Sequence, residues 1–206
     1  MNGSYRFALA LAATLALPAL CGAATWNLDP SHSTAEFKVR HLMVSNVRGE
    51  FRKVAGTVAI DDQEVTRSVM DVTIEAASID TADAKRDEHL KSADFFDVTR
   101  FPTITFKSKQ VQKAGKGKLK VKGDLTMHGV TREAVLDVEG PTAPVKDPWG
   151  ATRVGASATA KVNRKDYGLS WNKTLEGGGV LVGEEVSIHL AVELVKAANQ
   201  GPVAKN

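Results

Sequence analysis

The sequence predicts an antiparallel all-β domain with about eight strands. Hydrophobic and polar side chains alternate along most of the chain, and Gly, Pro, Asn and Asp gather between the alternating runs. A repeat of two residues turns one set of side chains toward a core and the other toward water, as in a strand with one buried face. Residues 83–96 are the exception to this alternation.

The alternating runs follow one another in chain order, and the last is the clearest. In it, five aliphatic residues from Val186 to Leu194 occupy every second position, with polar residues and Ala191 between them. The segments predicted to be strands are 36–40, 57–60, 71–76, 103–106, 118–127, 133–138, 154–162 and 185–194. The basic run 113–122 fits a solvated strand face and turn, because its lysines take the outward positions.

One short helix is predicted at 83–96. Charged residues surround Leu90, Phe95 and Phe96 there, and Ser92 could cap a second helical turn. Pro102 then favours an extended Phe101 and restarts strand structure.

Two architectures fit such strands, a two-sheet sandwich and a closed barrel. The inward set of residues 154–162 is mostly alanine, flanked by Val154 and Val162. In an eight-stranded barrel, small inward residues can leave room for a ligand. In a sandwich, they would face bulky partners in a filled core. Periodicity alone leaves both open.

The first 24 residues have the layout of an export signal. Arg6 gives a positive start, residues 7–20 consist mainly of Ala and Leu, and Gly22–Ala24 offers small residues for cleavage. We therefore expect residues 1–24 to be a signal peptide and residues 25–206 to form one domain.

Two alternatives fit this segment less well. A membrane-spanning helix needs about 20 apolar residues, whereas this run is shorter and contains Pro18. Lipid attachment through Cys21 would need a small residue before it, and Leu20 stands there.

Composition excludes several classes of protein. Cys21 is the one cysteine, so the mature chain has no disulfide framework, thiol nucleophile or cysteine-ligated metal. The chain has 27 Lys and Arg against 24 Asp and Glu, and these charges are interspersed. Such a near-neutral balance does not indicate nucleic-acid binding.

No catalytic or metal-binding motif is visible. The sequence lacks a Gly-x-Ser-x-Gly motif, a phosphate loop after a parallel strand and a paired carboxylate. The five histidines stand apart without metal-ligand spacing: His32, His41, His89, His128 and His189. His41 continues the parity of Phe37 and Val39, so we expect it to point inward. There it is either a hydrogen-bonded core residue or a contact for a polar head group at a cavity mouth.

Longer strings carry a resemblance over essentially the whole of residues 25–206. They are WNLDPSHS (26–33), FKVRHL (37–42), GEF (49–51), RDEHLKSADFFD (86–97), FPTITF (101–106), GDLTMHGVT (123–131) and NRKDYGL (163–169). In this order they resemble the YceI family of polyisoprenoid-binding proteins.

The resemblance implies an eight-stranded, antiparallel, lipocalin-like barrel with a short helix. It also implies an apolar internal pore that holds an isoprenoid lipid, such as a quinone or polyprenyl chain, in a periplasmic, often dimeric protein without established catalysis. A lipid tail can be held by shape and apolar area, because each buried methylene contributes about 0.8 kcal/mol. No catalytic cofactor or metal is implied.

The predicted ligand-binding residues are those with inward parity, together with three aromatic residues near an opening. A change of parity between Phe51 and Val58 leaves the register there open, and a slip of one residue would exchange lining for exterior. The set comprises Phe37, Val39, His41, Phe51, Val58, Val72, Ile74, Ile104, Phe106, Leu119, Leu125, Met127, Leu136, Ala156, Ala158, Ala160, Ile188, Leu190 and Val192, with Phe95, Phe96 and Trp171 near the opening. The charged motif residues are expected to be structural, with Arg86 and Arg164 pairing with carboxylates.

Three functions remain open from the sequence. The first is a periplasmic carrier or sink for an isoprenoid lipid. The second is a lipid isomerase or cyclase that uses His41 or an Asp at the cavity mouth as acid or base. The third is an interaction module with a filled barrel, whose outer surface contacts a membrane partner such as a quinone-reactive cytochrome.

Overall fold

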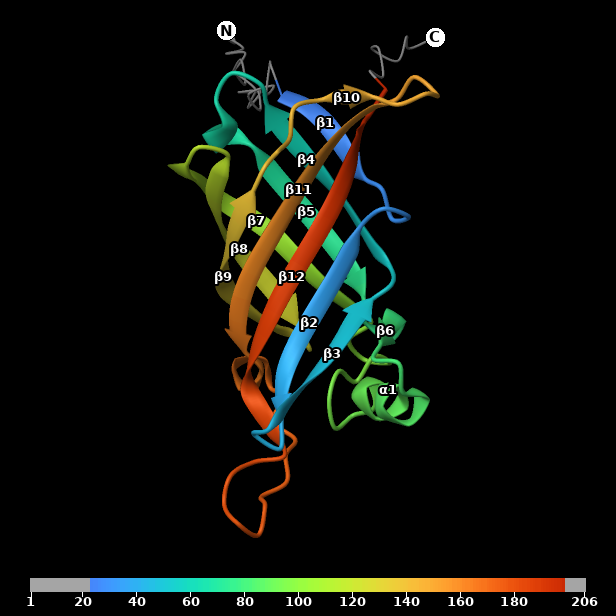
Figure 1. Cartoon of the computed structure of the whole chain (residues 1–206), viewed down its shortest axis with the longest axis vertical. Coiled ribbons are helices and arrows are strands. Elements are labelled where there is room, and N and C mark those ends of the chain that lie inside the picture. The colour runs from blue at the N-terminus through green and yellow to red at the C-terminus, as the bar shows by residue number, and fades with distance from the viewer. Residues whose placement is uncertain (1–22, 199–206) are drawn as a thin grey trace, which may run out of the picture.

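The computed structural model describes residues 23–198, and its strands form one twelve-stranded antiparallel sheet (Figure 1). Eight strands close into a barrel, in the order β11-β9-β8-β7-β5-β4-β1-β12, because β12 pairs back onto β11. The strands are β1 (Ala23–Leu28), β2 (Thr34–His41), β3 (Ser45–Phe51), β4 (Val54–Asp61), β5 (Val69–Glu75), β6 (Ile79–Asp80), β7 (Thr103–Gly115), β8 (Lys118–Met127), β9 (Val130–Glu139), β10 (Val145–Lys146), β11 (Thr152–Asn163) and β12 (Val182–Lys196).

The seam of the barrel is β12. One edge of β12 pairs with β11 along eleven residue pairs, from Arg153 opposite Val195 to Asn163 opposite Glu185. Its other edge is shared: β1 pairs with residues 194–196, and β2 pairs with residues 182–191. The sheet therefore divides between β1 and β2. From there β1 continues the ring toward β4, and β2 leads to β3 and β6.

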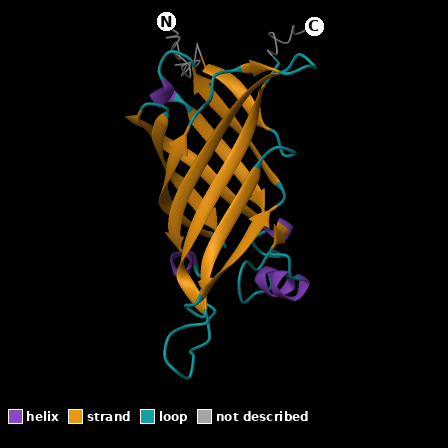
Figure 2. Ribbon diagram, in the orientation of Figure 1, coloured by secondary structure: helices purple, strands orange, loops and turns teal. Residues whose placement is uncertain are grey.

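The two ends of the barrel differ. At the end that we call the helix end, α1 (Ala84–Lys91) lies beside β3 and β6, and the chain reverses between β2 and β3 (Figure 1). The other end, the terminal end, is where β1 begins and β12 finishes. Three short 3₁₀ helices complete the structure (Figure 2): η1 (Val65–Arg67), η2 (Ala76–Ser78) and η3 (Arg164–Tyr167).

The expected barrel and its single α-helix are confirmed, and the sandwich is excluded. All eight predicted runs coincide with strands apart from Ala76, which begins η2, and the structure extends most of the runs at both ends. The sequence pattern missed β1 and β3, as well as the two-residue strands β6 and β10. In β3, Gly49 stands where an inward side chain was needed for alternation, and a Cβ there would lie 2.5 Å from the ring of Phe37. The glycine thus makes room for an aromatic side chain of the neighbouring strand.

The helix is shorter than predicted and ends at Lys91. Asp83 caps its start by accepting hydrogen bonds from the N–H groups of Lys85 and Arg86. At the other end Ser92 has an extended backbone, and residues 92–97 form turns that bury Phe95. The predicted second helical turn after Ser92 is therefore wrong, because burial of Phe95 determines the path of the chain here.

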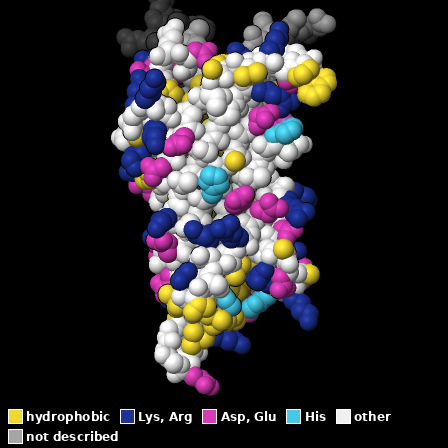
Figure 3. Space-filling model, viewed as in Figure 1, with side chains coloured by type: hydrophobic (Ala, Val, Ile, Leu, Met, Phe, Trp, Pro, Cys, Tyr) yellow, Lys and Arg dark blue, Asp and Glu magenta, His cyan; other side chains and the backbone are white. Residues whose placement is uncertain are grey.

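The barrel wall has an apolar inside and a charged outside. Val121, on β8, is fully buried, whereas its outward neighbours Lys120 and Lys122 form ion pairs with Asp137 and Glu133 on β9. On the face shown in Figure 3, charges of both signs are scattered over the wall, and hydrophobic side chains gather at the helix end. Within residues 23–198, no helix has the length and apolarity needed to cross a bilayer.

The proposed signal peptide lies almost wholly outside the described residues. Ala23 and Ala24 are described, and they begin β1, where they pair with Asp61 and Ile60 of β4. The boundary expected after Ala24 stays a prediction.

We predict that Gly123→Ala destabilises the barrel by about 1–3 kcal/mol, the usual cost of overpacking. Gly123 faces an irregular pairing in β7, and a Cβ there would lie 2.6 Å from Phe106 Cζ and closer still to the Lys107 carbonyl oxygen. Urea denaturation followed by circular dichroism measures the change. The matched control is Gly155→Ala on β11, where the nearest atom would lie 3.7 Å away. Equal stability of the two variants would contradict this account of the wall.

Candidate functional site

An apolar cavity of about 260 Å³ runs through the barrel. It is lined at the terminal end by residues such as Ile60 and Val65, and at the helix end by Phe95, Leu169 and Val182. From Val182 to Leu194 alone, β12 contributes roughly 40 Å of strand, at about 3.4 Å per residue. A small volume spread over this length is a narrow channel, and the surface that faces it is almost entirely apolar.

The width of the channel depends on small residues. Ala156, Ala158 and Ala160 project inward from β11, as the alternation predicted, and Ala35 and Ala134 add to them from β2 and β9. Larger residues at these positions would fill the interior, as they do in a close-packed core. The inward set of β11 is therefore the local reason for the cavity.

Aromatic side chains close the helix end. The ring of Phe95 lies 5.2 Å from that of Trp171, and the ring of His89 stands edge-on to both. Beside them Phe51 contacts Phe96 at 5.7 Å with nearly perpendicular rings. We call these five residues the aromatic closure. They come from α1, the turns after it, β3 and the segment before β12, so they join parts of the chain that strand pairing in the barrel does not connect.

Arg164 is the one charged residue among the cavity-lining residues that is buried, with 4 % of its surface exposed. Its guanidinium donates to the carbonyl oxygens of Leu169, Trp171, Val182 and Gly183. The expected carboxylate partner of Arg164 is therefore wrong. Burial lowers the pKa of Arg164 from its usual value, and the four carbonyl groups compensate the charge while tying η3 to the start of β12. The hydrogen bond to the Trp171 carbonyl also fixes the backbone of Trp171, whose ring belongs to the aromatic closure.

Arg86 likewise forms its short hydrogen bonds with a backbone carbonyl and a hydroxyl, and lies farther from a carboxylate. Its guanidinium donates to Thr81 Oγ1 and to the Thr81 carbonyl, both at 2.7 Å, whereas Asp83 lies at 4.0 Å. Asp87, in the same helix, accepts from the N–H and hydroxyl of Thr81. These contacts hold α1 against β6, so the charged residues of this motif are structural, as expected.

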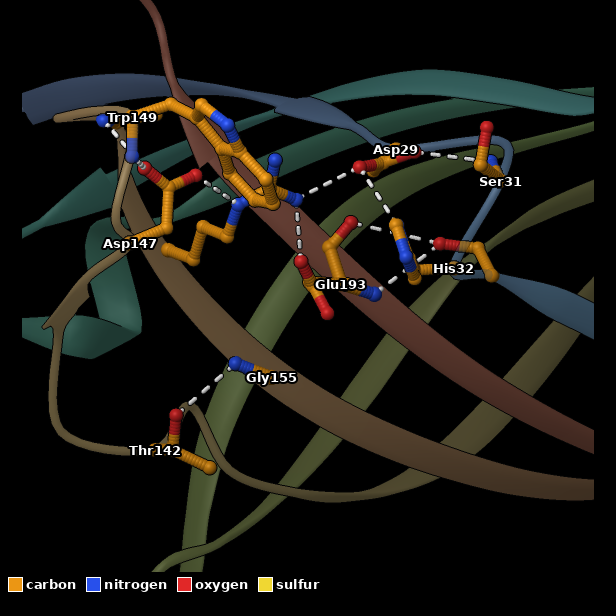
Figure 4. A network of polar contacts seen from close by, with 11 residues as sticks. Asp29, Ser31, His32, Thr142, Asp147, Trp149, Gly155 and Glu193 are labelled. Atoms are coloured by element: carbon orange, nitrogen blue, oxygen red, sulfur yellow. Dashed lines mark hydrogen bonds and ion pairs between the residues drawn. The ribbon is translucent and has the colours of Figure 1, made fainter.

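At the terminal end a second arginine holds the place where the sheet divides. Arg153 donates to Asp29, Asp147 and Glu193, which lie close around one point in Figure 4. Asp29 directly follows β1, and Asp147 also accepts from the N–H groups of Trp149 and Ala151. One guanidinium therefore ties the β1–β2 corner and the turn after β10 to β12.

This cluster also brings together three groups of metal-ligand type, Asp29, His32 and Glu193. Sequence spacing could not show this, because Glu193 is far along the chain from the other two. The Arg153 guanidinium contacts both carboxylates, so a cation already neutralises them in this geometry. We assign the cluster a structural role.

Most of the predicted ligand-binding residues line the cavity; the exceptions are His41 and Trp171. His41 is the last residue of β2, beyond the inward-facing Phe37 and Val39, and pairs with Ser45 and Val182 where the strands leave the cavity. His41 is therefore not a lining residue, although its cross-strand partner Val182 is one, and the inward orientation expected for His41 stays a prediction. Trp171 packs against Phe95 without lining the cavity itself. Binding of a ligand by the remaining residues stays a prediction.

Sequence reasoning missed a further group of lining residues. Some continue inward sets already recognised, as Val121, Val162, Val186 and Leu194 do, and alternation alone could have added them. Others lie in strands, helices or turns without clear alternation, so only the fold reveals them: Leu28, Ala35, Val54, Val65, Met70, Leu90, Val111, Pro141, Leu169 and Val182.

Comparison with known proteins gives the family. The YceI-like domain matches residues 26–194, which is nearly the whole barrel. The chain belongs to the YceI family. A UPF0312 protein of Vibrio cholerae is 39 % identical over 164 residues, covering 79 % of this chain and 86 % of that protein.

Solved structures agree with the YceI assignment. The Campylobacter jejuni YceI protein is 30 % identical, with a TM-score of 0.65 over 77 % of this chain and 90 % of the other. A polyisoprenoid binding domain from Saccharophagus degradans is 15 % identical with a TM-score of 0.61, covering 85 % of this chain and 99 % of that one. The second likeness shows the fold alone.

Acid is predicted to weaken the Arg153 cluster of this YceI-family barrel. The hydrogen bond from Arg153, with that from His32, lowers the pKa of Asp29 below its usual 3.8, and Arg153 also lowers the pKa of Asp147. Carboxylates with lowered pKa values stabilise the fold fully above about pH 4, and that contribution is lost as the pH falls below it. Arg153→Gln should therefore be less stable than wild type near neutral pH, and the gap should narrow as the pH falls toward 2.

The measurement is the free energy of unfolding at several pH values for both proteins. Lys161→Gln is the matched control, because Lys161 forms one exposed ion pair, with Glu185, and such pairs contribute little. A gap for Arg153→Gln that stays constant with pH would contradict the assigned role of the cluster.

Proposed function

We propose that the protein is a non-catalytic binding protein that holds the apolar tail of an isoprenoid lipid in the barrel cavity. The observation that carries this proposal is the narrow channel through the barrel, with its apolar surface and its alanine-lined wall on β11. Burial of methylene groups supplies the binding energy, at about 0.8 kcal/mol each, so a long tail needs few polar contacts.

The shape of the channel favours an unbranched or lightly branched chain over a compact ring system. The cavity extends along the barrel and its total volume is small for that length, so a tail fits lengthwise and a bulky group stays outside. A quinone or polyprenyl lipid has this form, with a thin tail and a larger head. The polyisoprenoid binding domain that shares the fold supports this choice of ligand class.

The geometry supports the function of a lipid carrier more than that of a lipid-modifying enzyme. His41, the residue considered as an acid or base, lies outside the cavity lining. The one buried cationic group that lines the cavity, Arg164, has its guanidinium engaged by four backbone carbonyl groups. Dimer formation and contact with a cytochrome stay predictions.

A single substitution on β11 tests the cavity. Ala158→Phe should lower the occupancy of a bound isoprenoid at least about tenfold, because displacing two methylene groups from the channel costs about that much. Thr159→Phe is the matched control, since Thr159 is the next residue on the same strand and faces outward. Native mass spectrometry and organic extraction of the purified proteins measure the bound lipid, and thermal unfolding checks the fold.

Two outcomes would contradict the proposal. One is wild-type protein that neither carries an apolar molecule on purification nor takes up a short polyprenol or ubiquinone added in solution. The other is equal lipid retention by folded Ala158→Phe and Thr159→Phe proteins.

We further propose that the chain is exported to the periplasm and cleaved after Ala24. Cleavage there would shorten β1 but keep its two buried residues, Trp26 and Leu28. Expression of the full chain in a bacterium with two membranes should yield protein in the periplasmic fraction whose N-terminal sequence starts at Thr25. Recovery in the cytoplasm with Met1 retained would contradict this proposal.

A further inference from the structure

Three consecutive hydrophobic residues are exposed at the helix end of the barrel. Leu42, Met43 and Val44 form the turn between β2 and β3, with 39 %, 52 % and 76 % of their surfaces exposed. We call residues 42–44 the apolar turn. It lies where Figure 3 shows hydrophobic side chains gathered at the helix end. A turn of this kind normally carries polar residues, Gly or Asn, so its composition calls for a reason.

The backbone holds the apolar turn in an outward-facing conformation. Leu42 and Met43 have φ angles of 50° and 62°, a left-handed region that side chains other than those of Gly, Asn and Asp seldom adopt. The Leu42 N–H donates to the Leu181 carbonyl at 2.8 Å, and the Val44 N–H donates to the His41 carbonyl at 3.1 Å. Backbone strain of this kind persists only where surrounding contacts fix it, and it gathers at functional sites.

The apolar turn borders the end of the cavity. Val39 and Val182 both line the cavity, and Val182 pairs with His41, the residue directly before the turn. On its other side, Met43 lies near Gly179 in the loop before β12. Whatever the apolar turn contacts is therefore brought to the helix end of the channel.

The charges around the apolar turn favour an anionic surface. Arg40 and Lys173 are exposed, and neither takes part in an ion pair within residues 23–198. Glu176 is the one acidic residue of the adjoining segment 171–181. The nearest carboxylate on β12, Glu184, is already paired with Lys165.

The terminal end also exposes apolar side chains, and charges of both signs lie near them. Val145 and Trp149 are 64 % and 86 % exposed there. However, Trp149 follows the carboxylate cluster of Figure 4, in which Asp29, Asp147 and Glu193 outnumber the single guanidinium of Arg153. Exposed apolar groups thus occur at both ends, and Lys146 beside Val145 is an exposed cation that forms no ion pair within residues 23–198. The helix end differs because three adjacent apolar side chains stand on one turn with left-handed backbone angles, with Arg40 and Lys173 as unpaired cations nearby.

We propose that the apolar turn docks the barrel on a lipid bilayer with anionic head groups, and so brings the helix end of the cavity to the membrane surface. A short, projecting apolar tip with cations behind it fits the membrane interface, where apolar side chains enter the acyl boundary and basic side chains meet anionic lipids. A protein partner would require about 800 Å² of surface, far more than three side chains provide. The benefit of docking rests on the proposed lipid-binding function, although docking itself can be measured alone.

Vesicle flotation tests the docking surface. The protein recovered from the exported fraction is mixed with vesicles of phosphatidylcholine, with or without phosphatidylglycerol. Binding should be stronger with the anionic lipid. The double substitution Met43→Ser and Val44→Ser should weaken partitioning about tenfold or more, because two apolar side chains no longer enter the interface. Trp149→Ser, which removes a more exposed side chain at the terminal end, should leave binding unchanged.

Two charge variants test the electrostatic part of the proposal. Arg40→Gln should weaken binding to the anionic vesicles, and Glu176→Gln should strengthen it, each by a few fold, because a basic residue near the surface of an anionic bilayer contributes modest attraction. Neither change should matter for vesicles of phosphatidylcholine alone. Opposite or absent effects on the anionic vesicles would remove charge complementarity as the reason for docking.

A fluorescent reporter shows which end enters the membrane. Val44→Cys and Val145→Cys, each in a chain carrying Cys21→Ser, are labelled with an environment-sensitive fluorophore. With anionic vesicles the emission at position 44 should shift to the blue and that at position 145 should not. A shift at position 145 alone, or at neither position, would overturn the proposal.

The same proteins separate this inference from the proposed function. Uptake of a short polyprenol added in solution should be unchanged in the Met43→Ser and Val44→Ser protein, whereas extraction of a long-chain isoprenoid from vesicles should be slower. If wild type docks through position 44 but takes up no isoprenoid, lipid carriage fails and docking stands. If wild type takes up the polyprenol but shows no vesicle binding, docking fails and lipid binding stands. Thermal unfolding confirms that the variants are folded.

Discussion

Backbone pairing along both edges of β12 is the interaction on which the structure depends. The long ladder with β11 closes the ring, and the shared pairing with β1 and β2 decides where the sheet divides. Because every residue of a strand turns alternately in and out, this one ladder fixes which side chains face the channel on both strands. Ala156, for example, lies inside because its partner Val192 does.

Two arginines stabilise the places where the strand pairing of β12 is interrupted. At the corner between β1 and β2, the pairing of β12 passes from one strand to the other. Arg153 joins that corner to β12 by donating to the carboxylates of Asp29 and Glu193. At the opposite end, irregular pairing of β12 between Val182 and Val186 leaves carbonyl groups without strand partners, and Arg164 donates to them. The two sites use the same side chain differently: the partly buried Arg153 compensates charges, and the buried Arg164 satisfies backbone acceptors.

Alternation was enough to predict the wall and most of the lining, because burial on one face of a strand is a local property of the sequence. It did not show that the sheet closes into a barrel. That expectation came from the resemblance of long sequence motifs to a family. Alternation failed at Gly49, whose missing side chain hides a strand. Contacts such as those of Arg153 with Asp29 join residues more than a hundred positions apart, and no local pattern encodes them.

The closed ring has a consequence for the choice of ligand. A barrel bound by continuous ladders changes its girth only by gaining a strand or shifting register, so it cannot swell by small amounts around a thicker guest. The width of the cavity is therefore set by side chains alone. Among relatives with the same number of strands, exchanges at Ala156, Ala158 and Ala160 can tune the calibre of an accepted chain while the ladder of β11 and β12 stays intact.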